Sequence, residues 1–305
     1  MNQTAGESPR EKTLHLLITD SGLGGLSICA GIESNFRGTG APGRLKLTYF
    51  NAWPGSTGGY NSMPDMQSRA EVFNRALARM NEFRPDRIVI ACNTLSVLYP
   101  LTAHARSSVI PVLGIIDAGV DLFVEALRAD PAGSILIFGT RTTIESRVHR
   151  DRLRQAGIAG ERIVTHPCHG LAAAIEIDPD GPAVAGMIQS CAAEACAANP
   201  AGQRLYAGLA CTHYTYVADQ IRTVLERQSG KRVVILDPNR RLADIVTPVG
   251  GSGRITAGAL QTSVAVISGV VLEETRRRTM AKRLESISGV TARALLSYTH
   301  APDLF

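Results

Sequence analysis

Residues 87–94 read Arg87-Ile88-Val89-Ile90-Ala91-Cys92-Asn93-Thr94, an apolar run that ends in a thiol, an amide and a hydroxyl. The apolar part is continuous rather than alternating, as in strands that are buried on both faces of a parallel sheet. In open α/β sheets, ligands bind beyond the carboxyl ends of such strands. This stretch therefore predicts a buried parallel strand with candidate site residues directly after it.

The rest of the chain repeats this pattern. Comparable apolar runs occupy residues 14–19, 45–50, 112–116, 135–138, 162–166, 204–210 and 232–236, in addition to 87–91. Between them, apolar residues at helical spacing predict helices at 68–83, 118–129, 143–156, 183–198 and 216–227. Strands that alternate with helices indicate βαβ units, so the predicted fold class is α/β with open parallel sheets.

Polar or reactive residues recur where these strands end. They are Asp20, Asn51, Cys92, Asp117, Thr140, Cys168, Cys211 and Asp237. The carboxyl ends of parallel strands lie along one edge of a sheet, and this is where open α/β sheets bind their ligands. The recurrence predicts an active site at that edge more strongly than any one residue does.

The bulk composition is that of an ordinary globular protein. The chain has 305 residues and is 45% hydrophobic, which predicts two domains or one large one. The net charge of +5 comes without a basic stripe, except for a short run at 274–278 and 282–283, which we interpret as a solvated helix face. No nucleic-acid partner is therefore expected.

The sequence also predicts a cytoplasmic protein with reduced thiols. Residues 1–12 are polar and charged, so no secretory signal is expected, and no apolar stretch reaches the roughly 20 residues of a membrane span. No membrane partner is expected. The six cysteines lack CxxC spacing, which argues against a structural metal site.

Two of the cysteines have matching surroundings. Cys92 follows Ile90-Ala91, and Cys211 follows Leu209-Ala210 at the end of a second apolar run. Each cysteine precedes hydrogen-bonding residues at an expected helix start, where the helix dipole is predicted to lower the thiol pKa. A buried thiol can also be no more than a small apolar side chain. Two cysteines with the same neighbours favour the catalytic interpretation.

These motifs resemble the aspartate/glutamate racemase superfamily, and glutamate racemase in particular. The resemblance rests on four stretches: Asp20-Ser21-Gly22-Leu23-Gly24-Gly25-Leu26-Ser27, Ala91-Cys92-Asn93-Thr94, Gly139-Thr140-Arg141-Thr142-Thr143-Ile144-Glu145-Ser146 and Cys211-Thr212-His213-Tyr214. Their order and spacing match the family over about residues 14–245. The combination is specific, although each stretch alone would not be.

The resemblance implies two α/β domains with the active site in the cleft between them. By similarity, residues 12–112 plus 219–290 form the first domain, residues 113–218 the second, and residues 291–305 a C-terminal tail. Cys92 and Cys211 then lie on opposite walls of the cleft. The implied activity is cofactor-independent racemisation of an amino acid, in which one cysteine removes the α-proton and the other returns it to the opposite face.

The resemblance also implies roles for neighbouring residues. Asp20 would support Cys92, and His213 would support Cys211, with Glu176 as a weaker candidate beside the second thiol. The substrate-binding residues implied by the family are Ser21, Asn93, Thr94 and Thr212, with a looser match at Thr140 and Thr143. The glycines of the loop after Asp20 would let the backbone approach the ligand closely.

One loop departs from the family pattern. Glutamate racemases carry an aspartate, a tyrosine and a glycine after the second strand, and this chain has Ala52 in the place of the aspartate. Gly59 matches the family glycine, but Gly58 stands where the tyrosine belongs unless a small shift supplies Tyr60. The expected substrate is therefore glutamate first, with aspartate or a related acid as alternatives.

The segment after residue 250 also departs from the family. We predict one long helix there, followed by a tail at 299–305. A contact in a homodimer is one role that this segment could take.

Other functions remain open on the sequence alone. A cis–trans isomerase of an unsaturated diacid also uses two cysteines on this fold, whereas a decarboxylase of the superfamily keeps only the second, so Cys92 argues against it. A non-catalytic small-molecule binding protein is favoured by the altered 51–62 loop and disfavoured by the complete cysteine pair. A redox thiol protein is the least favoured alternative, because no resolving cysteine lies nearby in the sequence.

Overall fold

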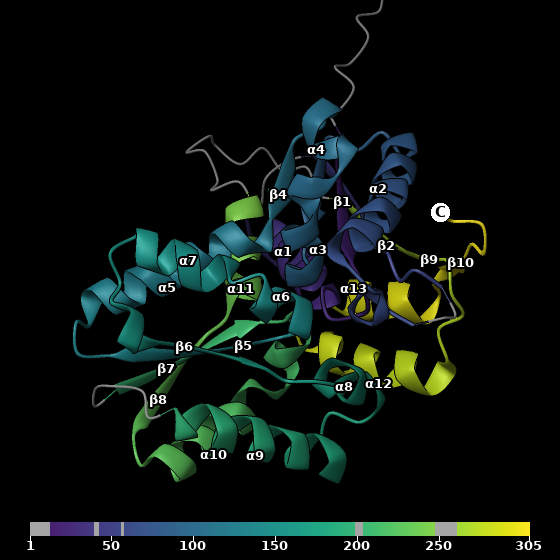
Figure 1. Ribbon diagram of the computed structural model, residues 1–305. Coiled ribbons are helices and arrows are strands. Elements are labelled where there is room, and N and C mark those ends of the chain that lie inside the picture. Colours follow the sequence, from purple (N-terminus) through teal and green to yellow (C-terminus); the bar gives the residue numbers. More distant parts are fainter. Residues whose placement is uncertain (1–12, 40–42, 56–57, 199–203, 248–260) are drawn as a thin grey trace, which may run out of the picture.

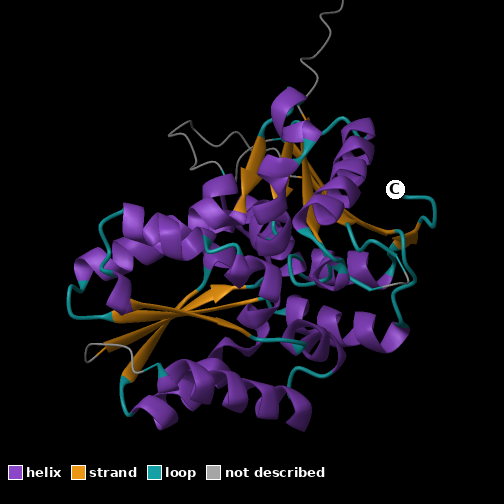
Figure 2. Cartoon of the chain, in the orientation of Figure 1, coloured by secondary structure: helices purple, strands orange, loops and turns teal. Residues whose placement is uncertain are grey.

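The structure is a computed structural model that describes residues 13–39, 43–55, 58–198, 204–247 and 261–305. Predictions for residues 1–12, 56–57 and 248–260 lie outside the described residues. Two parallel sheets, each with helices on both faces, make up the molecule (Figures 1 and 2). The predicted α/β class with open parallel sheets is confirmed.

The larger sheet, within the described residues, has the strand order β10-β9-β2-β1-β3-β4. Its strands are β1 (Thr13–Asp20), β2 (Arg44–Asn51), β3 (Arg87–Ile90), β4 (Val112–Gly114), β9 (Gln261–Ser268) and β10 (Thr299–His300). The smaller sheet has the order β6-β5-β7-β8. Its strands are β5 (Ser134–Gly139), β6 (Ile163–Pro167), β7 (Arg204–Ala210) and β8 (Arg232–Leu236). All eight predicted strands are present, and every pairing is parallel.

Helices cover both sheets. They are α1 (Leu26–Thr39), α2 (Met66–Glu82), α3 (Asn93–Leu98), α4 (Ala103–Ser107), α5 (Ile115–Ala129), α6 (Arg141–Glu145), α7 (Val148–Gln155), α8 (Leu171–Ile177), α9 (Pro182–Ala197), α10 (Ala218–Ser229), α11 (Pro238–Val246), α12 (Glu274–Glu285) and α13 (Gly289–Leu296). The 3-10 helices are η1 (Tyr60–Ser62), η2 (Tyr99–Leu101), η3 (Gly160–Arg162) and η4 (Thr212–Val217). In α2, the Asp65 side chain caps the first turn, and Phe73 and Leu77 are buried on the face that the apolar spacing predicts.

Two predicted helices differ in detail. The segment predicted as one helix at 143–156 is divided into α6 and α7, because Arg147 adopts a left-handed conformation with a φ of 60°. The segment predicted as a helix at 216–227 begins as η4 and becomes α-helical only at Ala218. As a result, Cys211 precedes a 3-10 turn rather than the start of an α-helix.

The prediction of one long helix after residue 250 is wrong for the described residues. Gln261–Ser268 forms strand β9, which extends the larger sheet by pairing with β2. The β-branched residues Val264, Val266 and Ile267 favour a strand, and the glycine that follows ends it. Ser288 then separates α12 from α13 by capping α13 through a bond from Thr291 N.

The two sheets do not follow the predicted domain boundaries. Strand β8 pairs with β7, so residues up to Leu236 lie in the smaller sheet, whereas the predicted boundary at 219 assigned them to the first domain. Residues 291–305 do not form a separate tail, because α13 spans the predicted boundary at 290/291 and β10 pairs with β9. The ring of Phe305 packs 5.8 Å from that of Phe50 in the larger sheet.

Candidate active site

The loop after β1 lies between the two sheets and is held by Asp20. The Asp20 carboxylate is buried and accepts hydrogen bonds from Ser21 N at 2.6 Å and from Gly25 N within its own loop. Its third partner is Thr212 Oγ1, at 2.8 Å, which comes directly after β7 of the smaller sheet. Asp20 therefore connects the loop after β1 to the end of β7 that carries Cys211, and none of these three hydrogen bonds goes to the Cys92 thiol.

Two buried or half-buried tyrosines fix the backbone of the same loop. Tyr49 donates a hydrogen bond to Gly22 O at 2.7 Å, and Tyr216 donates one to Gly24 O at 3.3 Å. The loop passes so close to the smaller sheet that a Cβ on Gly24 would lie 2.6 Å from His213 Nδ1 and 2.8 Å from His213 N. Glycine is required at this position by the close approach of the two backbones.

Cys92 is buried between the loop and α3. Its side chain is the N-cap of α3, where Sγ lies 3.5 Å from Leu95 N, and Ser21 Oγ lies 3.2 Å from the sulfur. Burial and the negative charge of Asp20 raise the pKa of the Cys92 thiol well above its usual range, although these two hydrogen bonds oppose the rise. The predicted lowering of this thiol pKa is therefore wrong, because burial outweighs a cap on a helix of only six residues.

Cys211 is supported by a buried relay of polar groups. Its sulfur lies 3.7 Å from His213 Nδ1, and His213 Nε2 lies 2.6 Å from Glu176 Oε1. The same carboxylate oxygen accepts a hydrogen bond from Leu23 N, at 2.8 Å, in the loop after β1. The structure thus brings Cys211 together with both residues that the sequence placed beside it, His213 and Glu176, although the motif match of Glu176 is the weaker.

The charges of this relay depend on one another. Burial lowers the pKa of His213, but its bonds to Cys211 and Glu176 raise the pKa well above its usual range. Burial raises the pKa of Glu176, but its hydrogen bond with His213 and the positive charge of that ring hold the pKa below its usual value. The stable form of the pair is therefore an imidazolium and a carboxylate.

This pair makes the stability of the protein depend on pH in a defined direction. A raised histidine pKa stabilises the fold fully below the ordinary value of 6.5 and less as pH rises through the folded value, whereas a lowered Glu176 pKa stabilises it above 4.5. The free energy of unfolding of the protein should therefore exceed that of His213→Gln most between those two values. Urea unfolding across pH 4 to 9 measures the difference.

The control for this measurement is His166→Gln. Burial lowers the pKa of His166 despite the nearby Glu194, so removing this histidine should cost no stability that fades above neutral pH. A His213→Gln difference that is flat from pH 5 to pH 9 would contradict the charge assignment of the relay.

Three threonine hydroxyls, one after β3 and two after β5, join the two halves of the molecule. Thr94 Oγ1 lies 2.8 Å from Thr140 Oγ1 and 3.4 Å from Thr143 Oγ1, and the last two lie 3.0 Å apart. Beside them, Asn93 is buried, and neither atom of its side-chain amide has a partner among the described residues. An amide with unsatisfied groups at this place is suited to bind a polar ligand.

The divergent loop places Tyr60 close to the first thiol. Tyr60 is buried in the same apolar cluster as Cys92, and its hydroxyl has no partner among the described residues. Gly58 has a φ of 111°, a conformation that a tyrosine would not readily adopt, and Gly59 packs against Trp53. This geometry favours Tyr60, rather than position 58, as the counterpart of the family tyrosine.

Several residues that sequence reasoning missed connect these parts. Asn61 Oδ1 accepts hydrogen bonds from the backbone N and hydroxyl of Thr142, and Arg69 donates to the same hydroxyl at 3.1 Å. Asn239 donates a hydrogen bond at 2.9 Å to the carbonyl oxygen of Thr212, the residue that follows Cys211 in the chain. Asn239 lies two positions after the strand-end residue Asp237, which was a usable signal, whereas no motif singled out Asn61 or Arg69.

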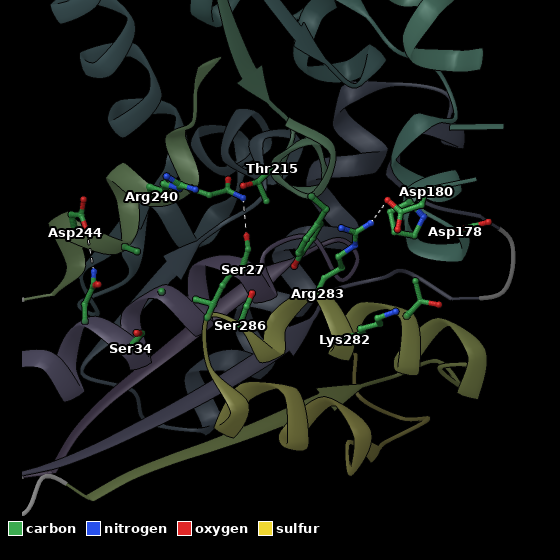
Figure 3. Close-up of a pocket in the computed structure, with 18 residues that line it drawn as sticks. Ser27, Ser34, Asp178, Asp180, Thr215, Arg240, Asp244, Lys282, Arg283 and Ser286 are labelled. Atoms are coloured by element: carbon green, nitrogen blue, oxygen red, sulfur yellow. Dashed lines mark hydrogen bonds and ion pairs between the residues drawn. The ribbon is translucent and has the colours of Figure 1, made fainter. Parts of the chain in front are cut away.

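A large pocket of the described chain lies behind this site rather than at it. It is lined by residues of α1, α11 and α12 and by the turn after α8, and it contains neither Cys92 nor Cys211 (Figure 3). The described residues contain no cluster of His, Cys, Asp and Glu suited to a metal ion. No helix within the described ranges is both long and apolar enough to cross a membrane.

Known proteins share this fold and these motifs. A solved glutamate racemase from Francisella tularensis in complex with D-glutamate is 18% identical and superposes with a TM-score of 0.62 over 89% of this chain and 94% of that one. Among curated relatives, the Campylobacter jejuni glutamate racemase is 40% identical over 82 residues, 27% of this chain and 32% of that protein. The Chlorobaculum tepidum glutamate racemase is 26% identical over 246 residues, 74% of this chain and 76% of that protein.

These relatives and the family match together identify an isomerase of the racemase class. The sequence model of the family described as Asp/Glu/Hydantoin racemase matches residues 18–246. The chain belongs to this family. The resemblance inferred from the four motifs, and with it the predicted enzyme class, is confirmed.

Proposed function

We propose that this protein is a cofactor-independent amino-acid racemase in which Cys92 and Cys211 exchange the α-proton of the substrate. One observation supports the proposal most. Strands β3 and β7, one from each sheet, are both followed by a buried cysteine, and Asp20, near Cys92, accepts a hydrogen bond from Thr212, next to Cys211. Such a pair can offer a base to one face of a ligand and an acid to the other.

The proton balance of the reaction needs only these two sulfurs. One thiolate removes the α-proton, the resulting carbanion takes a proton from the other thiol on its opposite face, and the two cysteines have then exchanged protonation states. The return reaction uses the same steps in reverse. The polar groups fixed around the cleft stabilise the carbanion while water is excluded.

The two thiols differ in the charges beside them. Cys211 has the imidazolium of His213 beside it, with 3.7 Å between Sγ and Nδ1. Burial and the negative charge of Asp20 raise the pKa of Cys92, which favours its neutral form in the free protein. The ammonium group of a bound amino acid supplies a positive charge that would favour ionisation of Cys92 in the complex. This chemistry needs reduced thiols, which favours the cytoplasm.

We propose glutamate as the substrate, with aspartate as the alternative. The names of the curated relatives support glutamate. Thr94, Thr140, Thr143 and the free amide of Asn93 are suited to a carboxylate and an ammonium group. We propose that Tyr60, whose buried hydroxyl has no partner among the described residues, contacts the distal part of the ligand. The loop at 51–62 is where the choice between the two acids would be made.

The test is exchange in heavy water. Each enantiomer of glutamate and of aspartate is incubated with the protein in D₂O, and the α-proton signal and the enantiomeric ratio are followed. We expect loss of the α-proton together with inversion for glutamate. Inversion of aspartate alone would keep the racemase and change its substrate. Absence of exchange with every amino acid tested would overturn the proposed function and favour a binding protein or the diacid isomerase.

A further inference from the structure

Helix α12, in the C-terminal part of the chain, packs against the half of the molecule that contains the larger sheet. Its residues Met280 and Leu284 are fully buried in the core on that side of the molecule. Arg277 adds hydrogen bonds to Leu272 O at 3.0 Å and to Leu296 O at 2.6 Å, and its guanidinium lies over the ring of Tyr298. The helix is therefore packed into the larger-sheet half, although it lies outside the region matched by the family.

Another face of α12 contacts α8 of the smaller-sheet half (Figure 1). Thr279 Oγ1 donates a hydrogen bond to Ile177 O at 3.4 Å, and Arg283 forms an ion pair with Asp180, which Figure 3 shows. One turn before Thr279, Arg276 Nε lies 3.5 Å from Glu176 Oε2. Positions 276, 279 and 283 are three and four residues apart, so they share one face of the helix. Three arginines of the basic run, Arg276, Arg277 and Arg283, therefore bond to other parts of the protein rather than forming only a solvated face.

The contact of Arg276 differs from the others because Glu176 belongs to the relay behind Cys211. The Glu176 side chain is 9% exposed, and burying a carboxylate is costly unless cations balance it. Within the described residues, its charged partners are His213 on one oxygen and Arg276 on the other. The groups that face it otherwise are the amide of Leu23 and the phenols of Tyr49 and Tyr216.

The charges along this line alternate from the helix to the reacting sulfur. Arg276 is positive, Glu176 negative, His213 positive, and the thiolate form of Cys211 negative, so the set is neutral when Cys211 is ionised. Without Arg276, ionised Cys211 would leave one uncompensated negative charge in a buried site. A low-dielectric surrounding makes that charge expensive.

We infer that Arg276 is a positioning residue for Cys211, which the C-terminal segment contributes across the boundary between the two halves. It holds Glu176 ionised and turned toward His213, and so favours the thiolate of Cys211 without touching the substrate. This inference rests on the proposed two-cysteine racemisation. Cys92 has no such support, because its neighbours are Ser21 and the capped end of α3.

The experiment compares Arg276→Gln with Arg283→Gln, which removes an ion pair from the same face of the same helix outside the relay. The first readout is the alkylation rate of Cys211 relative to Cys92 by iodoacetamide at pH 7, resolved by peptide mass spectrometry without substrate. Arg276→Gln should lower this ratio about tenfold, and Arg283→Gln should leave it within about twofold. A general loosening of the fold would move both thiols together.

The second readout is glutamate racemisation. Arg276→Gln should lower kcat about tenfold, and Arg276→Lys, which keeps the charge, should recover most of the loss. Equal alkylation ratios and equal kcat values in Arg276→Gln and Arg283→Gln would overturn the inference. Because alkylation uses no substrate, a protein that racemises nothing but shows the altered ratio would refute the proposed activity and leave the Arg276 relay standing.

Discussion

Cys92→Ala and Cys211→Ala should each lose inversion of the substrate by about 10³-fold or more, while each still exchanges the α-proton of one enantiomer with solvent. A protein with one remaining thiol can remove a proton from the face that it contacts and return one from solvent to that same face. The two variants should therefore exchange opposite enantiomers. The D₂O exchange and the enantiomeric ratio measured together give this result directly.

Cys29→Ala is the matched control for the cysteine variants. Cys29 is also fully buried, and burial raises its pKa to about 12, but it lies within helix α1 and not at a strand end. Its variant should invert the substrate at nearly the rate of the unchanged protein. If Cys92→Ala still inverts at that rate, or if both single variants exchange the same enantiomer, two facing thiols cannot be the two bases.

Gly24→Ala should cost about 100-fold in activity, because a displacement near 1 Å at the reacting groups has an effect of that size. The added methyl group would meet Thr212 and the His213 ring and backbone, and the backbone cannot yield without moving the end of β7. The loop would be pushed away from the smaller sheet, and the bond between Asp20 and Thr212 would stretch or break. Steady-state kinetics and thermal unfolding of the same samples measure the effect.

Gly38→Ala provides the comparison for Gly24→Ala. Gly38 lies near the end of α1, and a methyl group added there would meet no neighbouring side chain within 4 Å, so alanine should leave activity unchanged. It should stabilise the helix slightly, by at most about 1 kcal/mol. Equal activity in the two alanine variants would show that the loop after β1 can move without affecting the reaction.

The sequence predicted much of this protein because its informative features are local. Apolar runs, most of them nearly continuous, mark the eight predicted strands, and the polar residues that follow several of them make up the proposed site. The relay was also within reach, since His213 lies two positions after Cys211 and a motif match indicated Glu176. These local features could not predict the direction of a pKa shift. The dipole argument for Cys92 failed because its sign depends on burial and on the charge of Asp20, which only the folded chain brings together.

The C-terminal segment was the main failure, and the reason is physical. Strand β9 alternates between exposed and half-buried positions over its first five residues, and its apolar run at 264–267 is only four residues long. So short a run does not by itself distinguish a strand from part of a helix. The role of Arg276 has no local signal at all, because its partner Glu176 lies 100 positions earlier in the chain. Pairs of that kind follow from the packing of α12 on α8.

The three threonine hydroxyls that join the sheets have a consequence for stereochemistry. An enzyme that interconverts mirror images must hold both, and the two place their polar groups in reflected positions. A hydroxyl proton rotates, so Thr94, Thr140 and Thr143 can each donate in one complex and accept in the other. An arginine in their place, whose guanidinium donors have a fixed geometry, would favour one enantiomer over the other. Rotatable hydroxyls therefore suit a site that binds both enantiomers.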